Sequence, residues 1–353
     1  MSRIEKIVQA LPGYEIDGML ITGPVNRRWA TGFHSSAGAL LVTAEKSYFI
    51  TDSRYIEAAR AKIKGAEIIQ MQIGQEYPVM IAELAASHGL TRLGFEQDFM
   101  TQGAYTKYQE KLQAELVPAQ KLISTLRQSK DAEEYALIQK AQEITDLTFS
   151  QVLGLISPKI TEQELQAEIV YRLLKNGADK PAFDPIVVSG PRSSMPHGVA
   201  GDYLLSGFLT LDFGAVYQGY ASDMTRTVAI GSASKEMREV YDTVLKAQLA
   251  GIAAARAGVV GKEIDKAARQ VIQEAGYGDY FNHGFGHGLG LEVHESPNAS
   301  SLEEAVLPVG AVISAEPGIY LPGEFGVRIE DLLYLTESGS ENLTKSAKEL
   351  IIL

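Results

Sequence analysis

The sequence contains no cysteine. This absence excludes disulfide bonds, cysteine-ligated iron-sulfur clusters, thiolate zinc sites and a thiol nucleophile. Any metal ion that the protein binds must therefore be held mainly by histidine, aspartate and glutamate side chains.

Positive charge is scarce as well, with 32 Lys and Arg residues against 44 Asp and Glu residues. The net charge of −12 repels both the phosphate backbone of a nucleic acid and an anionic membrane surface. The amino-terminal residues include neither a secretory apolar block nor an apolar run long enough to span a bilayer. We therefore expect a cytoplasmic protein with no nucleic-acid partner and no membrane partner.

The length of 353 residues suffices for two domains. Up to about residue 123, amphipathic helices alternate with short apolar strands such as 38–43 and 47–51, which predicts a compact α/β domain. After a polar stretch at 127–130, apolar residues recur at helical spacing from Tyr135 to Leu155. A domain boundary is therefore expected near Ser124 to Lys130. The two predicted domains are residues 1–124 and 125–353.

The second half mixes helices with strands. Thr161-Glu-Gln-Glu matches a capping box that begins a helix, and further helices are expected over roughly 235–256 and 261–275. The apolar runs 208–216 and 220–230 are separated by only three residues, so they should form an antiparallel hairpin.

This hairpin brings two aspartates close together. A two-residue turn at Tyr217 and Gln218 places Asp212 directly opposite Asp223, whereas a turn at Gln218 and Gly219 makes them diagonal neighbours. In both registers the carboxylates share one face of the sheet, whereas a three-residue turn would separate them unless a bulge intervened. Their repulsion is relieved either by solvent, if this face is exposed, or by a bound cation. The hairpin alone does not decide between these two interpretations.

A second pair of acids lies on two predicted strands near the carboxyl terminus. Residues 311–316 form a predicted strand that Pro317 stops at Glu316, and residues 326–335 form another that contains Glu330. A glutamate at a strand end is usually solvated, but four acids on candidate paired strands favour a shared site.

Three of the six histidines, His283, His287 and His294, lie within twelve residues and alternate with glycines. Such glycines let the backbone approach a reacting group closely. His34 and His88 are interpreted as packed or solvated. The chain has no G-x-G-x-x-G or G-K-[ST] phosphate loop, no H-E-x-x-H zinc motif and no G-x-S-x-G nucleophile elbow.

These segments resemble the pita-bread metallopeptidases, which include aminopeptidase P, prolidase and methionine aminopeptidase, with creatinase as a non-peptidase relative. The amino-terminal Trp29-Ala-Thr-Gly-Phe and Thr51-Asp-Ser-Arg-Tyr resemble the creatinase-like domain of bacterial Xaa-Pro peptidases. The resemblance therefore covers nearly the whole chain. The matching segments of the second half are Leu211-Asp-Phe-Gly, Ser222-Asp-Met-Thr-Arg-Thr, Gly286-His-Gly-Leu-Gly, His294-Glu-Ser-Pro, Glu316-Pro-Gly-Ile-Tyr and Val327-Arg-Ile-Glu-Asp.

The resemblance implies an α/β creatinase-like amino-terminal domain followed by an α+β pita-bread catalytic domain with a curved antiparallel sheet. It also implies two divalent metal ions, whose four positive charges balance four carboxylates. Oxygen-rich ligation without sulfur suits manganese, with cobalt, zinc and iron as alternatives. In the implied ligand set, Asp212 binds one ion, His287 and Glu316 bind the other, and Asp223 and Glu330 bridge both.

By the same resemblance, a hydroxide that bridges the metals hydrolyses the Xaa-Pro bond of dipeptides or of peptide amino termini. Glu316 is the candidate base. His197 and His294 would hold the substrate carbonyl, and His283 would shape the pocket. Arg328 would orient His294 or a ligating carboxylate, unless it forms an ordinary surface ion pair.

Three alternative functions were weighed against this one. A methionine aminopeptidase is disfavoured by the long amino-terminal domain, and a creatinase-like hydrolase or a non-catalytic binding module by the complete ligand set. Dipeptidase and aminopeptidase activities stay equally compatible with the sequence. A homodimer is expected by analogy with related bacterial peptidases.

Overall fold

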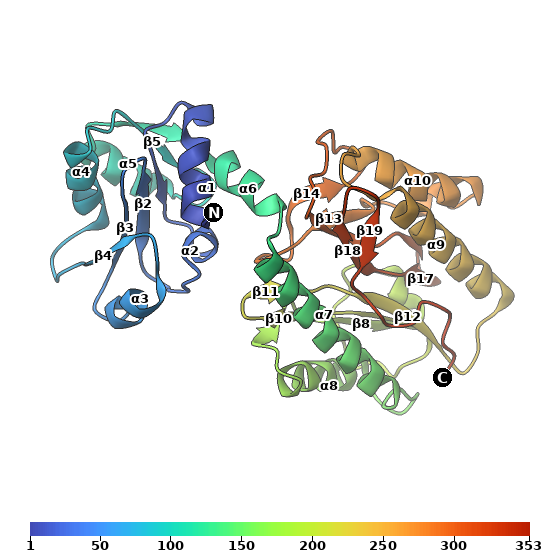
Figure 1. The fold of residues 1–353 in the computed structure, drawn as a ribbon. Helices are drawn as coiled ribbons and strands as arrows, with labels where there is room; N and C mark the ends of the chain where they lie inside the picture. Colours follow the sequence, from blue (N-terminus) through green and yellow to red (C-terminus); the bar gives the residue numbers. More distant parts are fainter. The chain divides into compact units, whose positions relative to one another are not determined.

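A computed structural model describes residues 1–353 of the protein. The chain forms two compact units, Met1–Arg127 and Gln128–Leu353 (Figure 1). No helix combines the length and the apolar composition needed to cross a membrane.

The first unit is built on a six-stranded mixed sheet with the order β4-β3-β2-β1-β5-β6. Strands β1, β2 and β3 pair antiparallel, whereas β4, β5 and β6 each join by parallel pairing. The α/β prediction for this unit is therefore confirmed. Its strands are β1 (Gly18–Ile21), β2 (Ala39–Thr43), β3 (Ser47–Thr51), β4 (Glu67–Gln70), β5 (Arg92–Phe95) and β6 (Glu115–Pro118). Its helices are α1 (Arg3–Ala10), η1 (Leu11–Tyr14), α2 (Pro24–Thr31), α3 (Ile56–Lys62), α4 (Tyr77–Ser87), α5 (Gln102–Lys111) and α6 (Gln120–Gln128).

The second unit contains four long helices, and each begins where the sequence predicted a helix. Asp131 and Thr161 each form a capping box, with Glu134 and Glu164 respectively, and Ser234 caps a third helix. These side chains satisfy backbone N–H groups that would otherwise lack partners at the helix start. The helices are α7 (Ala132–Leu153), α8 (Glu162–Lys175), α9 (Lys235–Ala254) and α10 (Gly261–Glu274).

The strands of the second unit pair antiparallel, which agrees with the predicted α+β class. They form the sheets β11-β10-β7, β12-β9-β8, β14-β13-β15-β18-β19 and β16-β17. The strands that precede α9 in this unit are β7 (Lys180–Pro181), β8 (Ile186–Ser189), β9 (Gly207–Asp212), β10 (Ala215–Tyr217), β11 (Tyr220–Ala221) and β12 (Thr225–Ile230). The later strands are β13 (Gly286–Gly288), β14 (Glu295–Ala299), β15 (Val312–Ala315), β16 (Gly318–Leu321), β17 (Phe325–Arg328), β18 (Asp331–Leu335) and β19 (Ser340–Asn342); the short helices are η2 (Gly190–Ser194) and η3 (Gly278–Tyr280).

The predicted hairpin adopts the second of the two registers. Tyr217 pairs with Tyr220, so Gln218 and Gly219 form the turn, and both have positive φ angles, as a type I′ turn requires. Asp212 pairs with Thr225. Asp212 and Asp223 are therefore diagonal neighbours on one face of the hairpin.

The predicted single strand 326–335 is wrong, because the chain breaks it at Glu330. Residues 325–328 form β17, which pairs with β16, whereas residues 331–335 form β18, which pairs with β15. At the break, the Glu330 N–H donates to the carbonyl of Thr225, and the Arg226 guanidinium donates to the carbonyl of Glu330. These two hydrogen bonds take the place of strand pairing at Glu330. Glu330 therefore lies where the chain passes from one sheet to another.

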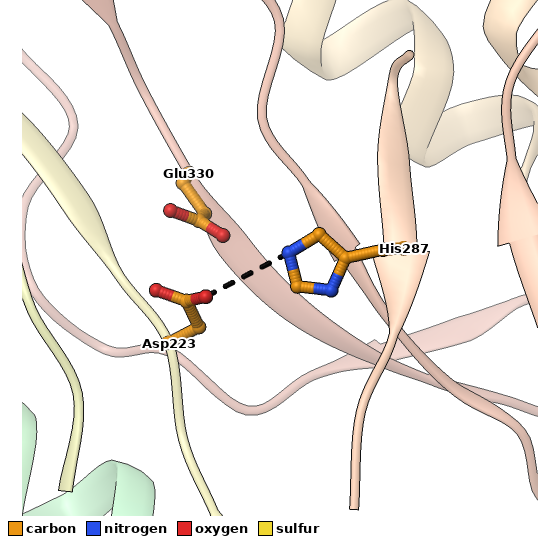
Figure 2. Close-up of side chains that lie close together, drawn as sticks. All are labelled: Asp223, His287 and Glu330. Atoms are coloured by element: carbon orange, nitrogen blue, oxygen red, sulfur yellow. Dashed lines mark ion pairs between the residues drawn. The ribbon is translucent and has the colours of Figure 1, made fainter. Parts of the chain in front are cut away.

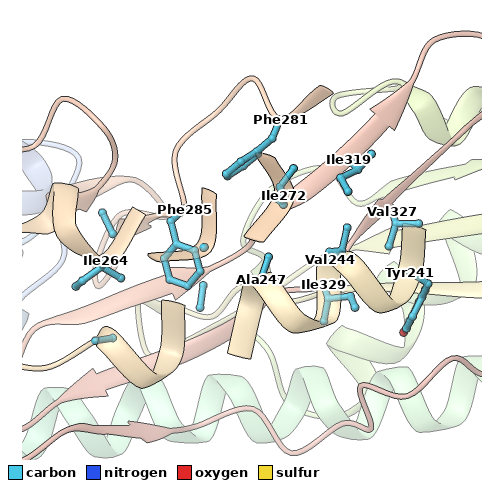
Figure 3. Packing of buried hydrophobic residues seen from close by; sticks show 14 of the residues in the cluster. Tyr241, Val244, Ala247, Ile264, Ile272, Phe281, Phe285, Ile319, Val327 and Ile329 are labelled. Carbon is cyan, nitrogen blue, oxygen red and sulfur yellow. The ribbon is translucent and has the colours of Figure 1, made fainter. Parts of the chain in front are cut away.

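Helices α9 and α10 pack against the sheets through a buried apolar cluster (Figure 3). Phe285 belongs to this cluster and lies two residues before His287. A Cβ atom at Gly251 of α9 would lie only 2.2 Å from the Phe285 ring, so glycine is needed there for the ring to fit. The core thereby fixes the backbone that leads into the histidine segment.

Candidate metal centre

Three separate segments of the second unit bring Asp223, His287 and Glu330 together (Figure 2). Their ligand atoms all lie within 4.8 Å of one another, and the His287 Nε2 atom is 3.7 Å from Asp223 Oδ2. Asp223 and Glu330 are almost entirely buried. The arrangement thus offers one nitrogen and several oxygen ligands around a common point.

The two remaining predicted ligands lie beside this cluster. Asp212 is the last residue of β9, and Glu316 directly follows β15. Glu316 Oε1 is 3.2 Å from His287 Nε2. All five side chains line one cavity of about 570 Å³, together with His197, His283, His294 and Arg328. The structure therefore gathers every residue that the sequence analysis assigned to the site.

The acids of the cavity have the character of cation ligands. Asp212 Oδ1, Asp223 Oδ1 and Glu330 Oε1 are buried and have no hydrogen-bond partner. Burial, followed by the charges of Glu330, Asp212 and Glu316, raises the pKa of Asp223 well above its usual value. Burial and the charges of Glu316 and Asp212 likewise raise the pKa of Glu330. Because a divalent cation would satisfy these oxygens and offset the repulsion, the residues fit a metal site. The solvated interpretation of the aspartates is wrong.

Glu316 and His287 interact closely, and each shifts the pKa of the other toward its charged form. Burial disfavours the charge of Glu316, but the hydrogen bond and charge of His287 outweigh burial and lower the pKa of Glu316 to about 2. Burial lowers the pKa of His287, and its interactions with Glu316 reverse the effect, so that the pKa is raised. The Ser314 hydroxyl accepts from the His287 N–H at 2.9 Å and donates to Glu316 Oε1 at 2.9 Å. Ser314 therefore links the backbone of His287 to the carboxylate of Glu316.

Arg328 is buried and contacts a ligating carboxylate. Its guanidinium donates to Asp212 Oδ2 at 2.6 Å, to the Tyr320 hydroxyl at 2.8 Å and to Thr225 Oγ1 at 3.0 Å. Only 4% of Arg328 is exposed, so the interpretation as a surface ion pair is wrong. Arg328 thus binds one oxygen of Asp212, and the other oxygen, Oδ1, has no hydrogen-bond partner in the protein.

The other three histidines line the cavity without joining the ligand cluster. His283 lies 3.0 Å from the Tyr320 hydroxyl through Nε2, and burial lowers the pKa of His283. The His294 ring packs against the His287 ring at a centroid distance of 4.2 Å. Partial burial and the charge of His287 lower the pKa of His294, which favours its neutral form. His197 is exposed at the rim.

Three residues that contact the site had been given no role by the sequence analysis. Thr225 donates to Glu330 Oε2 at 2.7 Å, and it lies two residues after Asp223 on the same face of the hairpin. Ser314 stands two residues before Glu316, so the period of a strand could have indicated that their side chains share a face. Tyr320 carries no comparable signal, because its contacts with His283 and Arg328 come from the hairpin of β16 and β17, which the sequence did not predict.

Comparisons with known proteins identify the family of the chain. Residues 136–337 match the model of metallopeptidase family M24, and residues 3–129 match the creatinase/prolidase N-terminal domain. The chain is 37% identical to an Xaa-Pro dipeptidase of Pyrococcus furiosus, over 99% of each chain.

Solved structures give the same result. The fold matches an Xaa-Pro dipeptidase from Bacillus anthracis with a TM-score of 0.97 and 42% identity, covering 99% of each chain. It matches an X-Pro aminopeptidase from Thermotoga maritima with a TM-score of 0.91 and 33% identity, covering 98% of this chain and 100% of that chain. The protein therefore belongs to metallopeptidase family M24 and carries a creatinase/prolidase N-terminal domain.

Proposed function

We propose that this protein hydrolyses the peptide bond that precedes proline, in dipeptides or at the amino termini of peptides. The observation that carries the proposal is the set of buried carboxylate oxygens without partners beside His287, at the wall of a cavity of about 570 Å³. The names of the related Xaa-Pro dipeptidases and X-Pro aminopeptidases support proline as the residue after the cleaved bond.

The proposal includes two divalent metal ions, for which manganese is the first candidate. Asp223 and Glu330 would contact both ions, Asp212 would hold one, and His287 and Glu316 would hold the other. When bound, such ions supply Lewis acidity and make a water molecule nucleophilic near neutral pH. The unpartnered oxygen of Asp212 supports its role, because Arg328 already binds the other oxygen and fixes the orientation of the carboxylate.

The histidines and Glu316 act on the substrate and the attacking water. Glu316 is ionised at neutral pH, because its pKa is about 2, and its carboxylate can accept a proton. His294 and His197, which line the cavity outside the ligand cluster, would donate hydrogen bonds to the substrate carbonyl as negative charge develops on its oxygen. His283, held by Tyr320, would shape the wall of the same pocket.

Hydrolysis rates on two peptide series test the proposed function. With added manganese, peptides that have proline in the second position should be cleaved, and matched peptides with alanine there should be largely ignored. The reason is that a pocket selective for proline accepts an imide nitrogen that donates no hydrogen bond. Equal rates on the two series would indicate a general aminopeptidase instead.

Comparing Xaa-Pro with Xaa-Pro-Xaa peptides in the same assay decides between dipeptidase and aminopeptidase activity. Faster cleavage of the dipeptides assigns the first, and faster cleavage of the longer peptides assigns the second. The homodimer and the cytoplasmic location stay predictions, which sedimentation and cell fractionation would test.

A further inference from the structure

His294 lies at the end of the loop that joins β13 to β14. Its imidazole packs against the His287 ring, and no hydrogen bond from another residue fixes it. The position of the imidazole therefore depends on the backbone of the loop. A donor that must meet a developing charge works only when it is held in place before the reaction.

The next residue, Glu295, folds its side chain into the interior of this loop. Its Oε2 atom accepts from the Glu292 N–H at 3.4 Å. A Cβ atom at Gly290 would lie only 2.7 Å from Glu295 Oε1, so the carboxylate lies directly against the backbone of residue 290. The Glu295 carboxylate thus contacts the loop at two residues that precede His294, Gly290 and Glu292.

A lysine from a distant part of the chain holds this carboxylate. Lys130 Nζ is 2.8 Å from Glu295 Oε1, and the exposed fractions of the two side chains are 1% and 7%. The backbone N–H of Lys130 donates to the carbonyl of Gly310 at 2.9 Å, and Lys130 directly precedes Asp131, the N-cap of α7. The ion pair therefore ties the His294 loop to a fixed point at the start of a 22-residue helix.

We propose that the Lys130–Glu295 ion pair positions His294 for its contact with the substrate. Lys130 lines neither the cavity nor the ligand cluster, so it is a positioning residue that acts through Glu295. Two charges removed from water bring little net stability compared with an apolar pair of similar size, and their geometry fixes one conformation. The proposal rests on the function proposed above, because that function assigns His294 to the substrate.

A double-mutant cycle between Lys130 and His294 tests the proposal. Lys130→Met should lower kcat for an Xaa-Pro peptide by ~10-fold or more, because small displacements of a positioned group are costly. Its KM should change much less, and its metal content should equal that of the wild type. In the His294→Ala background the same substitution should leave kcat within about twofold, because the side chain that Lys130 positions is already absent.

Two further variants separate positioning from stability. The double variant Lys130→Met/Glu295→Gln contains no unpaired buried charge, so it should regain the Tm lost in Lys130→Met while kcat stays low. Lys262→Met is the matched control, since Lys262 forms an exposed ion pair with Glu304 and should change neither kcat nor Tm. If Lys130→Met does not fold, Glu295→Gln enters the same cycle, because it removes the charge and keeps the shape.

An equal loss of kcat in the wild-type and His294→Ala backgrounds would overturn the positioning role. An unchanged kcat in a folded Lys130→Met variant would overturn it as well. Failure of the proposed function is read separately, from a wild-type enzyme that cleaves no Xaa-Pro peptide.

Discussion

Glu330 and Asp331 are consecutive acids, and both are fully enclosed, yet their surroundings differ sharply. Glu330 has one oxygen without a partner, and burial together with neighbouring carboxylates raises its pKa. Burial would raise the pKa of Asp331 too, but the charges of Arg226 and Lys348 outweigh burial and lower that pKa.

The hydrogen bonds of the two carboxylates express the same difference. Asp331 Oδ1 accepts from Arg226 at 2.8 Å, and Oδ2 accepts from Lys348, Gln248 and Asn342 at 2.7 to 2.9 Å. Both carboxylate oxygens of Asp331 thus have partners within the protein, whereas Glu330 and Asp223 each keep one oxygen without a partner, which the proposed metal ions would fill. Two consecutive acids therefore differ in whether the protein itself satisfies them.

The largest expected effect comes from removing an acid that has an oxygen without a hydrogen-bond partner. Asp223→Ala and Glu330→Ala should each abolish hydrolysis and lower the metal content, because each carboxylate is assigned to both ions. Metal analysis of the purified variants, alongside a peptide assay, measures both effects. Normal metal content in both variants would remove the basis for a two-metal site.

Replacing Asp331, whose carboxylate oxygens all have partners in the protein, should affect stability and leave metal binding intact. Asp331→Asn leaves the buried charge of Arg226 uncompensated and should lower the free energy of unfolding by about 3 to 5 kcal/mol. Folded protein should still bind metal, since the Glu330 carboxylate is unchanged. Denaturant unfolding measures the stability. If Asp331→Asn kept full stability and lost its metal, the distinction between the two acids would fail.

His287 and His294, whose rings are in contact, should differ in their effect on metal content. His294→Ala should keep its metal and its fold but lose ~10² to 10³ in kcat, the range seen when one preorganised oxyanion donor is removed. His287→Ala should lose metal together with rate. Metal analysis and kinetics on both variants measure the contrast. The reverse pattern of metal loss would show that the ligand assignment is wrong.

The smallest effect is a pH dependence of the metal-free protein. Because the pKa values of Asp223 and Glu330 are raised, the folded state binds protons more tightly than the unfolded state, so stability should fall as pH rises above about 4, the ordinary carboxyl pKa. The raised pKa of His287 acts in the same direction. Asp331, with its lowered pKa, contributes stability that disappears only at more acidic pH.

Thermal unfolding of the chelated protein at increasing pH should reveal this decline as a falling Tm. Glu330→Gln, which cannot titrate, should flatten the decline. A slope that is the same in the wild type and in this variant would refute the assigned cause.

Local signals made much of this structure predictable. The capping box at Thr161 uses residues three apart, and the hairpin placed Asp212 and Asp223 on one face through the two-residue period of a strand. The five ligand positions were predicted through family resemblance. Their meeting in one cavity depends on pairings between distant strands, which periodicity does not specify.

What the sequence could not predict involves long separations or a local break of pattern. Lys130 and Glu295 stand 165 residues apart, so no spacing rule links them. Residues 326–335 are apolar enough for one strand, and only the bonds that Thr225 and Arg226 make with the Glu330 backbone reveal the break. Because of that break, Glu330 lies outside both strands and joins the cluster with Asp223 and His287.

The most direct test of a two-metal site is a titration of the chelated wild-type enzyme with manganese. Activity on an Xaa-Pro dipeptide and bound metal are measured on the same samples. The account predicts no activity without metal and a plateau at two ions per chain, the number that the four carboxylates balance. Full activity in the chelated enzyme, or a plateau at a single ion per chain, would contradict it.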